Sequence, residues 1–248
     1  MGSCPPGAQV ADLPKLVDGL LAKAGGGIHR TSKPQQRDPV PLEVALHQQV
    51  SAVPFCPCVV GLLDSFTQPE SCLLVLERPE PCIDLFDFVK QKGSYLEEPM
   101  AKDFLRQVVQ ALQHCHAHGV VHRDLKMENI LVETISHSLK LIDLGLASRL
   151  RERFYTDQAG TLEFLAPETM CFGQYRALPA TVWSVGVLLY VLLCGSYPFC
   201  DGTAIIQGRL SFPSRLSRDC YDLIRSCCNV SAASRLTLEE ILLHPWMA

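Results

Sequence analysis

Side chains suited to phosphoryl transfer are concentrated in one short segment near the middle of the chain. This segment, residues 122–129, reads HRDLKMEN and has the spacing H-R-D-x-x-x-x-N. Asp124 could accept the proton of an attacking hydroxyl, Lys126 could neutralise a moving phosphoryl group, and Asn129 could hold a metal ion. The segment therefore predicts a catalytic loop in which Asp124, Lys126 and Asn129 carry the chemistry.

A second carboxylate is spaced to complete such a site. Asp143 begins the triplet DLG, fourteen positions after Asn129, and directly follows residues 139–142, which have the pattern of a strand. A carboxylate after a strand is the context of the metal-binding motif D-F-G. The triplet APE at 166–168 then closes an activation segment of plausible length. Three motifs in this order and spacing predict a protein kinase fold, with Asn129 and Asp143 as metal ligands.

Hydrophobic periodicity indicates which elements position these residues. The predicted elements are a helix beginning after Pro41, strands at 59–66 and 72–76 paired as a hairpin, a helix through 104–115, strands at 130–132 and 139–142, and helices at 181–193, 219–228 and 238–243. The expected fold class is α+β, with a small, partly truncated, β-rich N-lobe and a larger, mainly helical C-lobe. The expected boundaries are 1–77 for the N-lobe, 78–83 for the hinge and 84–248 for the C-lobe.

Composition argues against several other classes of protein. The net charge of −4 lacks the basic excess of a nucleic-acid-binding protein, so we expect no nucleic-acid partner. The apolar stretch Val185–Cys194 is too short to cross a bilayer, so we expect no membrane association. The twelve cysteines form no C-x-x-C pair, and no signal peptide opens the chain. We expect a monomer in a reducing compartment, the cytoplasm, with the nucleus as an alternative.

Over residues 40–247 the chain resembles a protein kinase of the Pim family. Residues 76–81, LERPEP, followed by DLFDF at 84–88, resemble the Pim hinge, whose proline removes a backbone N–H that other kinases offer to adenine. Val182, where most kinases carry Asp, is another Pim-like substitution. The resemblance implies a serine/threonine kinase that uses ATP and Mg²⁺ and acts on protein substrates.

The resemblance also implies roles for individual residues. It implies that Leu76 is the gatekeeper, Glu77 part of the nucleotide site and Leu131 the floor under adenine. It also implies that Thr161 is a serine/threonine-type signature at the substrate site and that Glu168 pairs with Arg235. Asp84, Asp87 and Glu128 match acidic positions that hold arginines upstream of the target residue. Two further acidic positions are replaced by Met127 and Ser196, so we expect a basic preference weaker than the family's.

The N-terminal part departs most from the family. The stretch 2–7 is the candidate for the glycine loop, but its middle glycine is Cys4 and two prolines remove amide donors. Lys23 is the candidate phosphate-binding lysine, paired with Glu43, and Lys33 is its rival. His47 occupies a position that is apolar in the family.

These departures leave two alternatives to an active kinase. One is a pseudokinase or binding module that keeps the fold but holds nucleotide poorly, and the other is an incomplete gene model that lacks the true upper lobe. The presence of Asp124, Lys126, Asn129 and Asp143 favours the active kinase over the pseudokinase.

Overall fold

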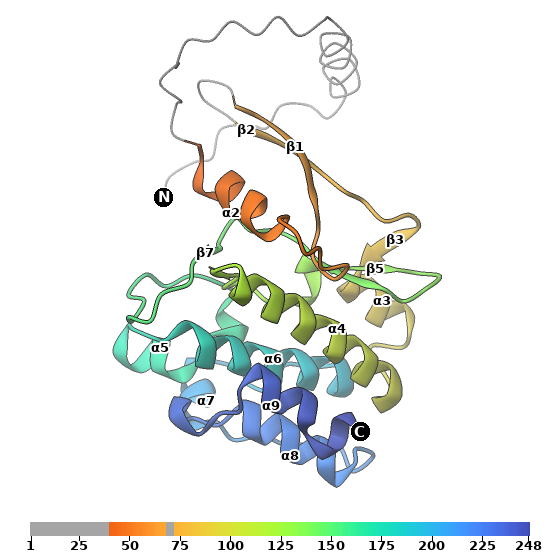
Figure 1. Cartoon of the computed structure of the whole chain (residues 1–248). Coiled ribbons are helices and arrows are strands. Elements are labelled where there is room, and N and C mark those ends of the chain that lie inside the picture. The colour runs from red at the N-terminus through yellow and green to blue at the C-terminus, as the bar shows by residue number, and fades with distance from the viewer. Residues whose placement is uncertain (1–39, 68–71) are drawn as a thin grey trace, which may run out of the picture. The chain divides into compact units, whose positions relative to one another are not determined.

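A computed structural model of the chain describes residues 40–67 and 72–248, all within the unit Val40–Ala248 (Figure 1). Its helices are α2 (Leu42–Val50), α3 (Leu85–Gln91), α4 (Glu98–Ala117), α5 (Pro167–Phe172), α6 (Ala177–Cys194), α7 (Gly202–Gln207), α8 (Arg218–Cys227) and α9 (Leu238–Leu243). Its strands are β1 (Leu62–Thr67), β2 (Cys72–Leu76), β3 (Cys82–Asp84), β4 (Val120–Val121), β5 (Ile130–Glu133), β6 (Leu139–Leu141) and β7 (Ser148–Arg149). Short 3₁₀ helices are η2 (Met127–Asn129), η3 (Leu162–Phe164), η4 (Ala232–Ser234) and η5 (Pro245–Met247).

Strands β1 and β2 pair antiparallel, which confirms the predicted pairing of these two segments. Leu62 lies opposite Leu76 at one end of the register. The first strand starts at Leu62 rather than at Val59 as predicted. The reason is that Val59 forms a parallel bridge with Leu141 of β6, and the N–H of Val60 donates to the carbonyl of Leu141 at 3.0 Å. This apolar segment therefore joins a different sheet from the one its pattern suggested.

The sheet β3-β5-β6 brings the two predicted metal-binding residues to one end of a strand pair. The two strands predicted at 130–132 and 139–142 are confirmed as β5 and β6, which pair antiparallel with Ile130 opposite Leu141. Asn129 immediately precedes β5, and Asp143 follows shortly after β6. The N–H of Ile142 donates to the carbonyl of Asn129 at 2.9 Å, which ties the two segments together beyond the strands.

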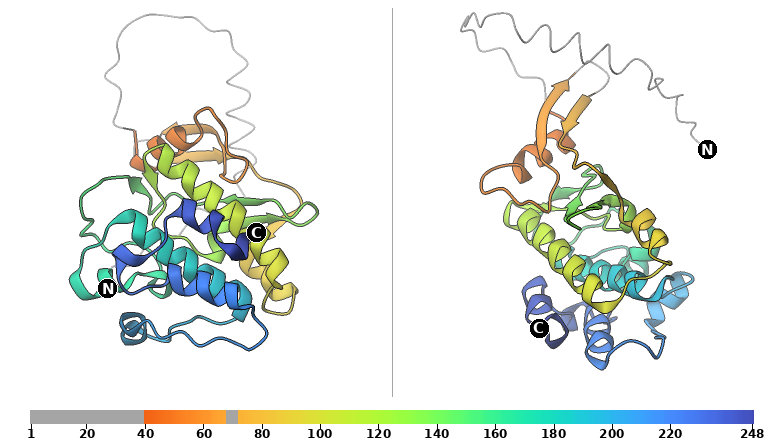
Figure 2. Two further views of the ribbon diagram at one scale, coloured as in Figure 1. Left: turned by 60° about the horizontal axis from the view of Figure 1, so that its bottom comes forward. Right: turned by 90° about the vertical axis from the view of Figure 1, so that its right-hand side faces the viewer.

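Helix α6 forms the centre of the helical part and packs against α4 and α8 (Figures 1 and 2). It is apolar enough over 18 residues to cross a membrane, but 72% of it is buried inside the unit, as expected of a core helix. Gly186 permits the close approach of α8, because a Cβ there would lie 2.6 Å from the Cβ of Cys227. The predicted helix at 181–193 is confirmed and begins earlier, at Ala177.

A buried ion pair connects the end of the activation segment to the C-terminal helices. The guanidinium of Arg235 donates to both carboxylate oxygens of Glu168, at 2.8 and 2.6 Å, and its side chain is fully buried. The same group lies over the ring of Trp183, 5.1 Å from the ring centroid. The predicted pairing of Glu168 with Arg235 is confirmed.

Candidate active site

The carboxylate of Asp124 is the centre of a dense hydrogen-bond cluster. The side chain is buried, and Oδ1 accepts from the backbone N–H of Thr161 at 3.0 Å and from its hydroxyl at 2.8 Å. Oδ2 accepts from Asn129 Nδ2 at 3.0 Å and forms an ion pair with Lys126 Nζ at 2.9 Å. Lys126 Nζ also donates to the Thr161 hydroxyl at 3.2 Å. Three residues that the sequence singled out, Lys126, Asn129 and Thr161, therefore meet at the Asp124 carboxylate.

These contacts determine the ionisation of the pair at the centre of the cluster. Burial alone would raise the pKa of Asp124, but hydrogen bonds from Lys126, Thr161 and Asn129 outweigh burial and hold the pKa below its usual value. The hydrogen bond to Asp124 raises the pKa of Lys126. Asp124 is therefore an anion and Lys126 a cation at neutral pH.

Asn129 is oriented so that its amide oxygen is available to a cation. Its Nδ2 donates to the backbone carbonyl of Asp124 at 2.9 Å as well as to the carboxylate, so both amide hydrogens have acceptors on one residue. Asp143 is exposed and has a positive φ of 65°, and its Oδ1 accepts from the N–H of Gly145 at 3.0 Å. One amide oxygen and one carboxylate are ligands that suit Mg²⁺.

His122 couples the catalytic loop to the segment that carries Asp143. Its ring is buried, Nδ1 accepts from the N–H of Asp124 at 3.3 Å, and Nε2 lies 2.9 Å from the carbonyl of Ile142. Because Nδ1 accepts, Nε2 carries the proton and donates to Ile142. Burial lowers the pKa of His122, which agrees with a neutral ring.

His47, at the position that the sequence comparison expects to be apolar, is buried. The residue is 1% exposed, on α2, and neither ring nitrogen has a hydrogen-bond partner within residues 40–67 and 72–248. Burial lowers its pKa, and the negative charge of Asp143 opposes this effect in part. Leu144, the middle residue of DLG, is also buried, at 2% exposure.

A contact that motif spacing did not predict fixes the activation segment. Arg123 has a positive φ of 69° and forms a salt bridge to Asp157, and its Nε donates to the carbonyl of Leu146 at 2.7 Å. The hydrogen bond from Arg123 lowers the pKa of Asp157. Gly160 follows with a φ of 107°, and a Cβ there would lie 2.5 Å from the Arg123 carbonyl oxygen. Arg123, directly before Asp124, could have been recognised in the sequence as a candidate for an ion pair, but its partner Asp157 lies 34 positions away.

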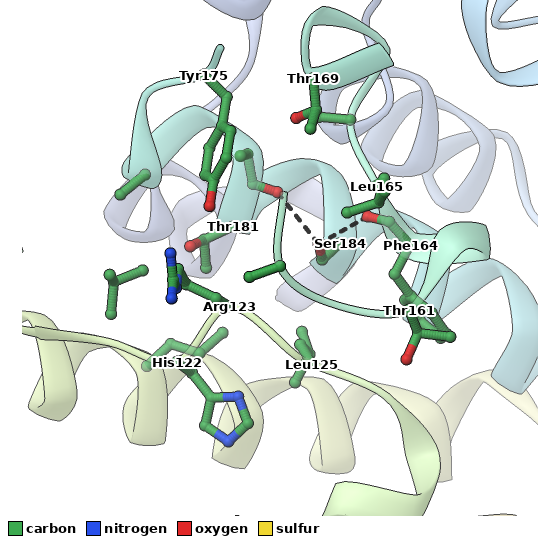
Figure 3. A pocket seen from close by; sticks show the side chains of 16 residues that line it. His122, Arg123, Leu125, Thr161, Phe164, Leu165, Thr169, Tyr175, Thr181 and Ser184 are labelled. Atoms are coloured by element: carbon green, nitrogen blue, oxygen red, sulfur yellow. Dashed lines mark hydrogen bonds between the residues drawn. The ribbon is translucent and has the colours of Figure 1, made fainter. Parts of the chain in front are cut away.

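The segment after Thr161 rests on helix α6 (Figure 3). The hydroxyl of Ser184 lies 3.0 Å from the carbonyl oxygen of Phe164 and 3.2 Å from that of Ala180. The cavity between these elements has a volume of about 30 Å³, room for one or two water molecules. Helix α6 therefore supports the segment that follows Thr161, and the cavity between them is too small for a substrate side chain.

The residues predicted around adenine lie in β2, in β5 and at the start of the connector, the segment 77–81 between β2 and β3. Leu76 ends β2 opposite Leu62, and the half-buried Leu131 lies in β5 opposite Asp84. The carboxylate of Glu77 accepts from Lys140 Nζ at 2.8 Å and from the N–H of Gly61 at 2.7 Å. The Glu77 side chain therefore braces the connector.

The three predicted substrate-binding acids differ in their surroundings. Asp84 is the N-cap of α3, and its Oδ1 accepts from the N–H of Asp87 at 2.8 Å. Asp87 and Glu128 are exposed. Asp84 thus has a structural role, in which one of its carboxylate oxygens is engaged in capping α3.

Two predictions concern the N-terminal segment. Lys23 and the candidate glycine loop at 2–7 lie outside the residues that the structure describes, as does Lys33. Glu43 is half-buried in the first turn of α2. The Lys23–Glu43 ion pair therefore stays a prediction.

Comparison with known proteins agrees with this geometry. Residues 28–247 match the protein kinase domain family. The chain is 42% identical to serine/threonine-protein kinase pim-2 of Danio rerio, over 99% of this chain and 80% of that protein. It is 41% identical to serine/threonine-protein kinase prk-2 of Caenorhabditis elegans, over 84% of this chain and 47% of that protein. A human SNF-related serine/threonine-protein kinase is 33% identical over 77% of this chain and 26% of that protein.

The chain belongs to the protein kinase family, and its resemblance to the Pim serine/threonine kinases is confirmed. Protein kinases as a family use ATP and Mg²⁺, and Asn129 and Asp143 carry the kind of oxygen donor that Mg²⁺ prefers.

Proposed function

We propose that this chain is a serine/threonine protein kinase that transfers the γ-phosphoryl group of ATP to protein substrates. The observation that carries the proposal is the cluster in which Lys126, Thr161 and Asn129 converge on the Asp124 carboxylate. Phosphoryl transfer requires mainly positioning and charge stabilisation, and this cluster supplies a base, a cation and a metal ligand within hydrogen-bond distance of each other.

The contacts around Asp124 suggest how the hydroxyl of the substrate enters. All four hydrogen bonds to the carboxylate come from the protein itself, so the substrate hydroxyl replaces one of them. The hydrogen bond from the Thr161 hydroxyl is the easiest to replace, because this hydroxyl can still accept a hydrogen bond from Lys126. Asp124 is ionised, so it accepts a hydrogen bond from the incoming hydroxyl and takes the proton as transfer proceeds.

Asn129 through its amide oxygen and Asp143 through its carboxylate would hold Mg²⁺. The bound metal would neutralise charge on the phosphates. The backbone hydrogen bond from Ile142 to Asn129 keeps the two ligand-bearing segments together. Lys23 paired with Glu43 would provide the cation on the opposite side of the phosphates.

The kinase fold also gives roles to the residues predicted for the nucleotide base and for the substrate. Leu76, Glu77 and Leu131 would surround adenine, with residues 1–77, 78–83 and 84–248 as N-lobe, hinge and C-lobe. Exposed carboxylates at Asp87 and Glu128 would pair with arginines of the substrate, because guanidinium and carboxylate groups form bidentate, charge-assisted bonds.

The experiment uses labelled ATP, Mg²⁺ and three basic peptides that differ only in the acceptor, which is Ser, Thr or Tyr. We expect phosphate on the Ser and Thr peptides and none on the Tyr peptide. Asp124→Asn should remove transfer while ATP still raises the melting temperature of the variant. Equal labelling by wild type and Asp124→Asn, or labelling of the Tyr peptide alone, would overturn the proposal.

A further inference from the structure

A cavity of about 310 Å³ opens beside the catalytic loop, between α3 and the end of α6. Its floor consists of Val89, Met127 and Val191, each 4% exposed. Two aromatic residues line its rim, Phe86 at 45% and Tyr197 at 40% exposure. The cavity thus combines a buried apolar floor with exposed aromatic walls, which is the composition of a site for an apolar group.

The charges of the lining exclude a basic occupant. Lys90 is the one charged residue among the described residues that line the cavity, and no carboxylate is among them. The guanidinium of an arginine placed here would be desolvated without a carboxylate in the lining and would meet the like charge of Lys90. Glu128 precedes Asn129 on the exposed side of the same loop and is the nearby candidate for an arginine.

The cavity adjoins both segments that hold the acceptor hydroxyl. Met127 lies three residues after Asp124, in the same loop. The ring of Tyr197 meets the ring of Phe164 edge to face, with centroids 5.9 Å apart, and Phe164 lies three residues after Thr161. A peptide whose Ser or Thr reaches Asp124 therefore has the cavity within reach of a neighbouring side chain.

We propose that this cavity binds an aliphatic side chain of the protein substrate, near in sequence to the phosphorylated residue. The proposal rests on the kinase activity proposed above and specifies its substrates as carrying both a basic and an aliphatic residue. In a hydrophobic pocket, one methylene of the substrate changes kcat/KM by about 10–200-fold. We therefore expect this cavity to favour an aliphatic over a polar side chain by about tenfold in kcat/KM.

The test is a set of Ser peptides in which each position within five residues of the acceptor is in turn Leu, Asn or Arg. Asn is the polar control of similar size. We expect one position at which Leu exceeds both Asn and Arg by about tenfold in kcat/KM.

Two exposed lining residues provide the variants. Ser196→Asp and Lys90→Glu place a carboxylate at the cavity and should reverse the order at that one position, so that Arg exceeds Leu. Ser214→Asp, an exposed serine outside the cavity lining, is the matched control and should leave the order unchanged. All three substitutions are at exposed positions, and melting curves check that each variant is folded.

Failure of this proposal and failure of the proposed function give different results. If wild type phosphorylates the peptides but no position selects Leu, the cavity proposal is wrong and the kinase activity stands. The cavity proposal is equally wrong if Ser196→Asp and Lys90→Glu leave the preference for Leu intact. If no peptide is phosphorylated, the proposed function and the cavity proposal are both contradicted.

Discussion

Replacement of His47 by Leu should stabilise the protein. The neutral imidazole has one N–H donor and one acceptor nitrogen, and both are buried without a partner among the described residues. A buried polar group without a hydrogen bond costs about 1–3 kcal/mol, so removing two such groups recovers about 2 kcal/mol even at the lower limit. For a domain of this size, about 2 kcal/mol raises the melting temperature by about 4–8 °C.

The pH dependence of this gain provides a second readout. Burial lowers the pKa of His47 in the folded state below its unfolded value, so the unfolded state binds the proton more readily. Wild type therefore loses stability as the pH falls through about 6.5, the pKa of an unfolded histidine. His47→Leu lacks this loss, and the difference in melting temperature between the two proteins should widen from pH 8 to pH 5.5.

The assay is thermal unfolding of the metal-free and nucleotide-free protein at both pH values. Gln48→Leu, an exposed position on the same helix, is the matched control and should change the melting temperature little. If His47→Leu melts at or below the temperature of wild type at pH 8, the predicted gain is wrong. Such a result would mean that the ring nitrogens have partners or that the ring packs better than leucine can.

Three further predictions concern the activation segment and the N-terminal part. Glu168→Gln should lower the free energy of unfolding by about 3–5 kcal/mol in denaturant titrations, because it leaves the buried Arg235 guanidinium without its counter-charge; a loss below about 1 kcal/mol would contradict this. Thr161→Val should lower kcat by about tenfold or more, because it removes the hydroxyl that accepts from Lys126, while Thr161→Ser keeps this hydroxyl and most of kcat; equal rates for the two variants would show that the hydroxyl has no role. Lys23→Met should reduce turnover by orders of magnitude while Lys33→Met does not, and wild-type kinetics in Lys23→Met would remove Lys23 from the nucleotide site.

Motif spacing predicted that Asp124, Lys126 and Asn129 lie close together, because these three residues are near one another in the sequence. Asp124, Lys126 and Asn129 lie within six positions of each other. The short 3₁₀ helix before β5 restricts the directions in which their side chains can point, so they lie close together. Helix α6 was equally predictable, since an element that is apolar all round must be buried.

The contacts that the sequence pattern did not predict join segments that are distant in the chain. Arg123 and Asp157 meet across 34 positions, and nothing in the pattern of either segment identifies the other. Val59 lies in a segment with the pattern of a strand, but it pairs with β6 and not with β2. Tertiary packing, which the local pattern does not encode, decides between the two partners. Asp84 is different, because an Asp directly before an amphipathic helix is an N-cap signal that could have been recognised in the sequence.

The turnover number of the chain relative to that of Asp124→Asn decides whether this cluster transfers phosphate. Both proteins are assayed with saturating ATP, Mg²⁺ and a Ser peptide, and ATP binding to each is measured separately. We expect Asp124→Asn to bind ATP but to turn over at least about 10²-fold more slowly, because the base at the centre of the cluster is lost. A ratio of turnover numbers near one, or no turnover by wild type with ATP bound, would show that the cluster around Asp124 does not catalyse the transfer.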